Sequence, residues 1–505
     1  MQNGASLSRS ILLAGLITGI LADVLLRATP WGLNLLLWVL APVASTLVLA
    51  RRDRSSRESY LIRRGACAAA FAAGFAWRDS SVLVGLDIIA LFGLFSLGSL
   101  RSALRSVRSA SLWECTSASF TFGFASAFGM FPLLINDIKW KPNASVFRSK
   151  PVMAVIRGVL LALPLVLVFG WLFAGADPVF GSLVGKAFNL NMDFPDLLVQ
   201  LLIITACCWF ASGYMRRVLA NVEVPAEEST GAIRPSLGVV DISVALGLVN
   251  LLFLAFVIVQ FRYFFGGGER VQTVAGLTYS EYARRGFFEL VAVAALALPV
   301  LLAADWVAKK QSRQDEILFR SMAAILIGLL FVIMISAVQR MFLYLREYGQ
   351  TELRTYTTAF MAWLALLFLW FAATVLRGRR DRFAFGAMMA GFAIIGILHV
   401  ANPDAMIVRT NAGRAACGRT FDVAYNTSLS ADSVPELVKD IGLLRSEDQA
   451  RVARSLLDHW SSPTGDWRTW NSDRSAAVHA VQRAQPVLER YAASTYTQPI
   501  SASAR

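Results

Sequence analysis

Charged residues are scarce in this chain. They make up 16% of its 505 residues, whereas soluble globular proteins carry about 25%. Histidine is rarer still, with three scattered copies and no H-x-x-x-H pattern, and the five cysteines have no C-x-x-C spacing. These absences argue against a zinc site and against a disulfide framework. We therefore expect neither a metal nor another cofactor.

Signatures of catalysis and of nucleotide binding are also missing. The sequence has no G-x-S-x-G elbow, and the three glycines at 266–268 are not followed by the lysine of a phosphate-binding loop. The net charge is +14, a basic balance that many nucleic-acid-binding proteins share. Here the arginines and lysines gather in short clusters at the ends of hydrophobic runs, as they do in cytoplasmic loops of membrane proteins. We expect a lipid bilayer as partner, and no nucleic acid.

Long hydrophobic runs dominate residues 1–402. A run of about 20 apolar residues crosses the hydrocarbon core as a helix, because lipid offers no partner for backbone polar groups. The fold class predicted is all-α, a polytopic transmembrane helix bundle of 11–12 spans (1–402) with a small soluble helical C-terminal domain (403–505) whose end is frayed. The expected spans are Ile11–Leu26, Trp31–Ala50, Gly65–Trp77, Val82–Leu100, Leu112–Ile135, Val152–Ala174, Leu197–Tyr214, Ile242–Phe261, Phe287–Ala304, Ile317–Val338, Thr357–Leu376 and Phe383–Val400.

The number of crossings depends on Leu112–Ile135. This segment contains Glu114 and many Ser, Thr and Gly residues, so it is a candidate for a re-entrant segment. If it is re-entrant, eleven crossings place the main basic clusters and the N-terminus in the cytoplasm, and the C-terminal domain outside. If it crosses, three basic loops fall outside. The positive-inside rule favours eleven crossings, with Ile11–Leu26 as the first span rather than a cleaved leader.

The last hundred residues change in character and predict three helices. Ser433-Val434-Pro435-Glu436 has the spacing of a capping box with proline in the first turn, and Ser446-Glu447-Asp448-Gln449 repeats it. A third helix is expected from Asp473 to Tyr491. These signals predict a folded helical unit.

Several motifs together resemble those of a known family. They include the stretch LTYSEYARRGFFEL, and the resemblance extends from about Arg157 to Asn471. The set is similar to a domain-of-unknown-function family of bacterial multipass integral membrane proteins. The resemblance implies a bacterial cytoplasmic (inner) membrane location and no established activity. The motifs are Ala176–Phe180, Leu277–Leu290, Arg340–Arg354, Asn402–Asp404, Asp422–Tyr425, Asp432–Leu437 and Trp467–Asn471.

Two groups of polar residues form the candidate binding site. Each group follows helical i, i+4 spacing at the end of a span, and eleven crossings place both on the external side. The guanidinium of arginine can donate two parallel hydrogen bonds to a carboxylate or a phosphate. An anionic solute or a lipid headgroup is therefore the ligand to expect. The alternative is that opposite charges at span ends pair with one another. The candidate residues are Glu281, Arg284, Arg285, Glu289, Arg340, Tyr344, Glu347 and Arg354.

A separate candidate is the carboxylate of Asp87, which lies in the middle of a span. A charge there costs about 2.5–3.5 kcal/mol on insertion scales and often serves function. The same carboxyl can instead be protonated and hydrogen-bonded to a neighbour.

These observations favour a non-enzymatic membrane protein. We expect a transporter-like carrier, or a membrane scaffold whose C-terminal domain contacts a protein partner. The alternative is a membrane-embedded transferase acting on lipid-linked or phosphate-bearing substrates. In that case Glu281 or Glu289 is the base and the arginines hold phosphate.

Overall fold

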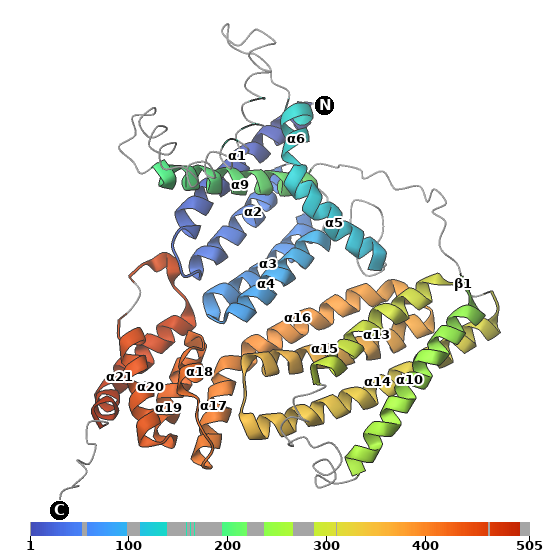
Figure 1. The fold of residues 1–505 in the computed structure, drawn as a ribbon. Helices are drawn as coiled ribbons and strands as arrows, with labels where there is room; N and C mark the ends of the chain where they lie inside the picture. Colours follow the sequence, from blue (N-terminus) through green and yellow to red (C-terminus); the bar gives the residue numbers. More distant parts are fainter. Residues whose placement is uncertain are drawn as a thin grey trace, which may run out of the picture. The chain divides into compact units, whose positions relative to one another are not determined.

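The structure is a computed structural model of the chain (Figure 1). It describes residues 2–52, 58–97, 112–138, 194–219, 237–265, 287–309, 311–462 and 465–494, together with Gly158, Ala162 and Val166. Apart from these three positions, the expected span Val152–Ala174 lies outside the described residues. The chain end from 495 onward, expected to be frayed, also lies outside them.

Helices make up nearly all of the described secondary structure, which confirms the all-α polytopic fold class. One pair of two-residue strands departs from it: β1 (Leu237–Gly238) pairs in parallel with β2 (Ala308–Lys309). The longer helices are α1 (Gln2–Leu26), α2 (Leu33–Arg52), α3 (Glu58–Trp77), α4 (Ser81–Leu97), α5 (Leu112–Phe128), α9 (Phe194–Leu219), α10 (Val239–Phe265), α13 (Phe287–Val307), α14 (Arg313–Tyr348), α15 (Glu352–Thr374), α16 (Phe383–Ala401), α17 (Pro403–Ala416), α20 (Ser446–Trp460) and α21 (Ser472–Ala493). The short turns are α6 (Met130–Pro132), α18 (Val423–Thr427), α19 (Val434–Asp440), the π-helical η3 (Leu133–Asp137) and the 3₁₀ turns η5 (Val375–Arg377), η6 (Arg380–Arg382), η7 (Ala431–Ser433), η8 (Ile441–Leu443) and η9 (Trp467–Thr469).

Eight helices in the described part of the chain are long and apolar enough to cross a membrane. They are α1, α2, α9, α10, α13, α14, α15 and α16. The expected spans Gly65–Trp77 and Val82–Leu100 correspond to α3 and α4, which are not among the eight. Helix α3 begins with polar and charged residues, and α4 has 17 residues, fewer than the roughly 20 that a straight span needs.

The segment expected at Leu112–Ile135 is broken rather than straight. A bend of 46° at Gly129 separates Cys115–Phe128 from Met130–Asp137. If this bent pair is counted as one span, the described residues contain nine candidate spans instead of eight. A bent pair of this kind also fits a re-entrant segment, so both alternatives remain at this stage.

The chain falls into two compact units. Unit 1 comprises Met1–Val107, Trp113–Pro225 and Pro463–Ser475, and unit 2 comprises Arg108–Leu112, Ala226–Ser462 and Ala476–Arg505. The domain boundary expected at 402/403 falls inside unit 2, between the end of α16 and the start of α17, and stays a prediction.

In unit 1, α1 packs along α9, and α2, α3 and α4 follow as neighbours. Glycines on α1 permit the first contact: a Cβ on Gly19 would lie 2.4 Å from the carbonyl oxygen of Ile204. Small residues of this kind let membrane helices approach closely. The basic ends of the helices meet, since Ala50, Leu61 and Val218 share one buried cluster near Arg51 and Arg217.

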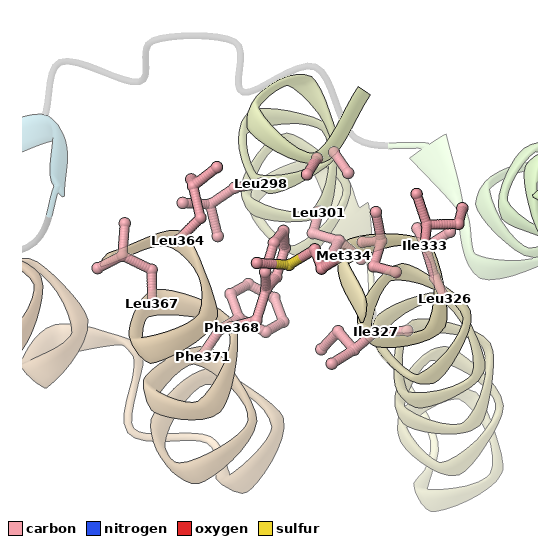
Figure 2. Close-up of a cluster of buried hydrophobic side chains, with 14 of the residues drawn as sticks. Leu298, Leu301, Leu326, Ile327, Ile333, Met334, Leu364, Leu367, Phe368 and Phe371 are labelled. Carbon is pink, nitrogen blue, oxygen red and sulfur yellow. The ribbon is translucent and has the colours of Figure 1, made fainter. Parts of the chain in front are cut away.

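In unit 2, the largest apolar core joins α13, α14 and α15. Leu298 and Leu301 of α13 face Leu326 and Met334 of α14, and Phe368 of α15 is fully buried beside them (Figure 2). A second apolar cluster unites α17 to α21. The C-terminal helices therefore have a core of their own within this unit.

The capping boxes expected in the C-terminal helices do not form. Helix α19 starts near the expected place, but Ser433 Oγ donates to the Ser430 carbonyl at 2.8 Å instead of capping the helix. Arg409 Nε donates to the Glu436 carboxylate at 2.7 Å, and Lys439 donates to it at 2.9 Å. These hydrogen bonds, the one from Arg409 first, lower the pKa of Glu436 to about 2. Helix α20 has Arg445 rather than Ser446 at its N-cap. In α19, a tertiary ion pair therefore engages the glutamate that the local capping box would use.

Candidate functional site: the α14–α15 junction

Helix α14 is long enough to leave the membrane. Its 36 residues extend for about 54 Å at 1.5 Å per residue, while the hydrocarbon core is about 30 Å thick. The expected span Ile317–Val338 covers the apolar part, so the last ten residues project beyond it. Gly349, with φ of 79°, ends the helix, and α15 starts at Glu352 (Figure 1). This turn carries three of the expected site residues.

The guanidinium of Arg354 is held within the turn itself. Its Cζ lies 4.1 Å from the centre of the Tyr344 ring, and Nη1 donates to the carbonyl of Gly349. A cation over an aromatic face is attracted by the ring quadrupole. Tyr344 also packs on Tyr348, with ring centres 4.8 Å apart. Arg354 therefore braces the turn between the two helices.

The carboxylate of Glu347 is paired with the C-terminal helices. Arg419 donates to it through both terminal nitrogens, at 3.1 and 3.3 Å. Arg414 of α17 donates to the carbonyls of Arg346 and Glu347, which have no partner within the last turn of α14. These two arginines close the end of α14 as cationic caps.

Asn411 makes the most buried contacts of the junction. Its Oδ1 accepts from the Gln350 amide at 2.8 Å, and its Nδ2 donates to the Gln350 carbonyl and to Asn426 Oδ1, both at 3.0 Å. The Glu352 amide donates to the hydroxyl of Tyr425 at 2.7 Å, and burial raises the pKa of that hydroxyl. Side chains of α17 and α18 therefore form hydrogen bonds with the backbone of the turn between α14 and α15.

These contacts define the α14–α15 junction, which brings together three of the eight expected site residues: Tyr344, Glu347 and Arg354. Arg340 lies buried in α14, and Glu289 is exposed in the first turn of α13. Glu281, Arg284 and Arg285 lie outside the described residues. Sequence reasoning did not assign Asn411, Arg414, Arg419, Tyr425 or Asn426 to the site. Of these residues only Tyr425 belongs to a motif, Asp422–Tyr425, and no spacing links the five to α14.

Asp87 is buried in α4, with 1% of its surface exposed. Asp23 is a second buried carboxylate of unit 1: Gln200 Nε2 donates to Asp23 Oδ2 at 2.9 Å, and Arg27 lies 3.9 Å from its other oxygen. Asp23 is therefore part of the packing between α1 and α9. The functional role expected for Asp87 stays a prediction.

A second polar cluster, which sequence reasoning missed, joins three distant segments of unit 1. We call it the turn clamp; it comprises Asn471, Asp473 and Arg474, the α1–α2 turn at 30–32, and Arg78 and Asp79 between α3 and α4. Asn471 Nδ2 donates to the carbonyls of Phe75 and Arg78, both at 3.0 Å.

Two ion pairs cross in the turn clamp. Arg78 Nη1 donates to Asp473 Oδ2 at 2.8 Å, and Arg474 Nε lies 2.9 Å from Asp79 Oδ1. Arg474 also donates to the Thr469 carbonyl at 2.9 Å and to the Trp31 carbonyl. Each arginine side chain is less than a tenth exposed. The clamp therefore fastens Pro463–Ser475 to two turns at the same end of the unit.

The described residues contain no group of His, Cys, Asp and Glu able to hold a metal ion. A family model, DUF4153 (domain of unknown function), matches residues 65–439 of the chain. The chain belongs to the DUF4153 family. No curated protein and no solved structure matches it.

The DUF4153 match contains the whole α14–α15 junction and only part of the turn clamp. It begins in α3 and ends in α19, so the α1–α2 turn and the segment 463–475 lie outside it. The expected membership of a family of unknown function is confirmed. Trp467–Asn471, counted among the resembling motifs, falls beyond the matched residues.

Proposed function

We propose that this DUF4153 protein is a membrane scaffold, in which the C-terminal helices are fastened to the ends of the spans and offer a surface to a protein partner. The observation that carries the proposal is the α14–α15 junction. The arginines there are bonded to the turn and to helix ends. An anion carrier would need these groups for its cargo, whereas a scaffold uses them to hold a domain in place.

The orientation proposed is a cytoplasmic N-terminus and an external C-terminal part. In unit 1, the turn clamp lies at the helix ends opposite Arg51, Arg52 and Arg217. In unit 2, the α14–α15 junction lies opposite the basic turn at 377–382, where Arg380 is 3.9 Å from Asp305 of α13. Each unit taken by itself therefore separates its basic end from the C-terminal elements, and basic ends favour the cytoplasm. The membrane we propose is the bacterial cytoplasmic membrane.

Contacts of the bent segment α5–η3 support eleven crossings. Ser119 Oγ lies 3.0 Å from Ser96 Oγ near the end of α4, and Asp137 lies 2.5 Å from Arg216 near the end of α9. Both parts of the segment therefore contact their neighbours near the C-terminal ends of those helices, and the end of α9 is basic. A re-entrant segment would make such contacts on one side of the membrane, and it would keep the basic loops on that side.

A native cysteine tests this orientation. Cys417 is exposed in the loop after α17, so a membrane-impermeant maleimide should label the chain in intact cells and fail to label Cys417→Ser. Arg379→Cys, in the Cys417→Ser background, should be labelled only after the cells are permeabilised. Labelling with the opposite sidedness would contradict eleven crossings and place the C-terminal helices in the cytoplasm.

The scaffold function itself is tested by site-specific photo-crosslinking in cells. Leu443 and Val487 are apolar residues of the C-terminal helices, with 47% and 48% of their surfaces exposed. A photoreactive residue at one or both positions should give a discrete adduct with another protein. Leu369 on α15, 56% exposed, is the matched position facing lipid and should give no such adduct. Absence of protein adducts at both sites would remove the support for a scaffold.

The transferase alternative stays a hypothesis without a geometric basis. Of its two candidate bases, Glu281 lies outside the described residues, and Glu289 is exposed at the start of α13. Of the candidate arginines for holding phosphate, Arg284 and Arg285 also lie outside the described residues, Arg340 is buried, and Arg354 is stacked on Tyr344. Within the described residues, no candidate base therefore lies beside a group of arginines that could hold phosphate.

A further inference from the structure

A cavity lies in unit 1 between the bent segment α5–η3 and the last turns of α9. Its volume is about 360 Å³, within the range of small-molecule sites. The walls are aromatic and apolar, with Phe124, Phe128 and Phe131 on one side, and Arg216 and Arg217 at the end of α9. It is distinct from the α14–α15 junction and from the turn clamp.

Two glycines create this cavity by fixing the bend. Gly129 lies where α5 turns by 46°, and a Cβ built on it would lie 3.0 Å from Gly213 Cα. A Cβ on Gly213 would lie 2.2 Å from the Ser126 carbonyl oxygen. The two backbones can approach only because neither residue has a side chain. The close contact fixes where the bent segment meets α9, and the cavity lies beside this contact.

The two arginines differ in their bonding. Arg216 Nε lies 2.5 Å from Asp137 Oδ2, so its charge is compensated within the protein. Arg217 has a buried Nε that has no hydrogen-bond partner among the described residues. An unpaired guanidinium beside an apolar wall is costly, because burial removes water without supplying an anion. An anion bound in the cavity would supply that partner.

The apolar walls narrow the choice of anion. Phe124, Phe128 and Phe131 are 58%, 48% and 37% exposed, and in a membrane their free surface faces acyl chains. The basic helix ends of the unit lie at the same level as the cavity. Basic pockets between helices on the cytoplasmic side are suited to anionic phospholipid headgroups. A ligand with a phosphate and an acyl chain satisfies both Arg217 and the rings.

We propose that the cavity between α5–η3 and α9 binds an anionic phospholipid, with the phosphate on Arg217 and an acyl chain against Phe124, Phe128 and Phe131. The site goes beyond the scaffold function and does not rest on it. Trp209 provides a reporter beside the cavity. Its Nε1 donates to the Ala127 carbonyl at 2.6 Å, and its ring centre is 5.1 Å from that of Phe131.

The experiment uses the full chain reconstituted in vesicles containing phospholipids brominated on the acyl chain. Quenching assigned to Trp209 is the difference between the native chain and Trp209→Phe. Brominated phosphatidylglycerol should quench Trp209 at about fivefold lower mole fraction than brominated phosphatidylcholine, the preference expected from one arginine near an anionic lipid. Equal quenching by the two lipids would overturn the proposal.

Matched variants identify the residues responsible. Arg217→Gln should remove the headgroup preference, and Arg217→Lys should keep most of it. Arg63→Gln removes the same charge from an exposed position at the same end of unit 1, and should leave the preference intact. Ala125→Phe, which fills the cavity, should reduce quenching by both lipids. A preference unchanged in Arg217→Gln, or lost equally in Arg63→Gln, would mean a general surface-charge effect and would overturn the site.

Discussion

Arg474→Ala is expected to lower the free energy of unfolding by about 3–5 kcal/mol, the usual cost of removing one partner from a buried ion pair. The substitution leaves Asp79, four-fifths buried, without its cation. It also removes the donors to the carbonyls of Thr469 and Trp31. Since those carbonyls belong to the clamp segment and to the α1–α2 turn, both should loosen together.

Thermal unfolding of the purified chain measures this effect, and limited proteolysis should show new cleavage within Pro463–Ser475. Arg483→Ala is the control, because Arg483 is an exposed arginine on the same helix, α21. It should change stability by less than about 0.5 kcal/mol. If both variants unfold alike, the turn clamp does not hold this segment.

The spans could be predicted because they need no information beyond local composition. Helix α16 begins at Phe383, the residue at which its apolar run begins. Lipid leaves no alternative to a helix for such a run. Helix α14 is longer than the expected span Ile317–Val338. Its last ten residues, Gln339–Tyr348, mix apolar with polar side chains, and Arg414 and Arg419 bond to its end.

The polar contacts could not be predicted, because they join residues far apart in sequence. Gln350 and Asn411 are separated by 61 positions, and Arg78 and Asp473 by 395. No periodicity connects such pairs. Sequence analysis placed Glu347 and Arg354 at the end of a span and left open whether they bind a ligand or pair. Glu347 is paired with Arg419, whereas Arg354 contacts the Tyr344 ring and the Gly349 carbonyl.

The same competition explains the failed capping boxes. A local spacing such as Ser433 to Glu436 offers one bond to the helix end. Glu436 instead receives hydrogen bonds from Arg409 and Lys439, at 2.7 and 2.9 Å, and bonds from charged donors are roughly twice as strong. Local signals therefore located the start of α19 but not the role of its side chains.

Asn411→Ala is expected to destabilise the α14–α15 junction by about 2–3 kcal/mol, since it leaves the partly buried amide of Gln350 and the buried Oδ1 of Asn426 without their partner. Asn411→Asp should be no milder. Its second oxygen would face the Gln350 carbonyl and Asn426 Oδ1, which are both acceptors. Thermal unfolding, with hydrogen exchange at the Gln350 amide, measures the loss. Thr410→Ala, next along α17 and exposed, is the matched control.

The result for Asn411 bears on function as well as on stability. If the junction fastens the C-terminal helices to α14 and α15, Asn411→Ala should also weaken the protein adducts formed at Leu443 or Val487, while Thr410→Ala keeps them. A variant that loses stability but keeps its adducts would mean that the partner recognises the C-terminal helices alone. A variant that keeps both its stability and its protein adducts would contradict the proposal that the junction supports the scaffold. The hydrogen bonds of Asn411 would then not be needed to position the C-terminal helices for the partner.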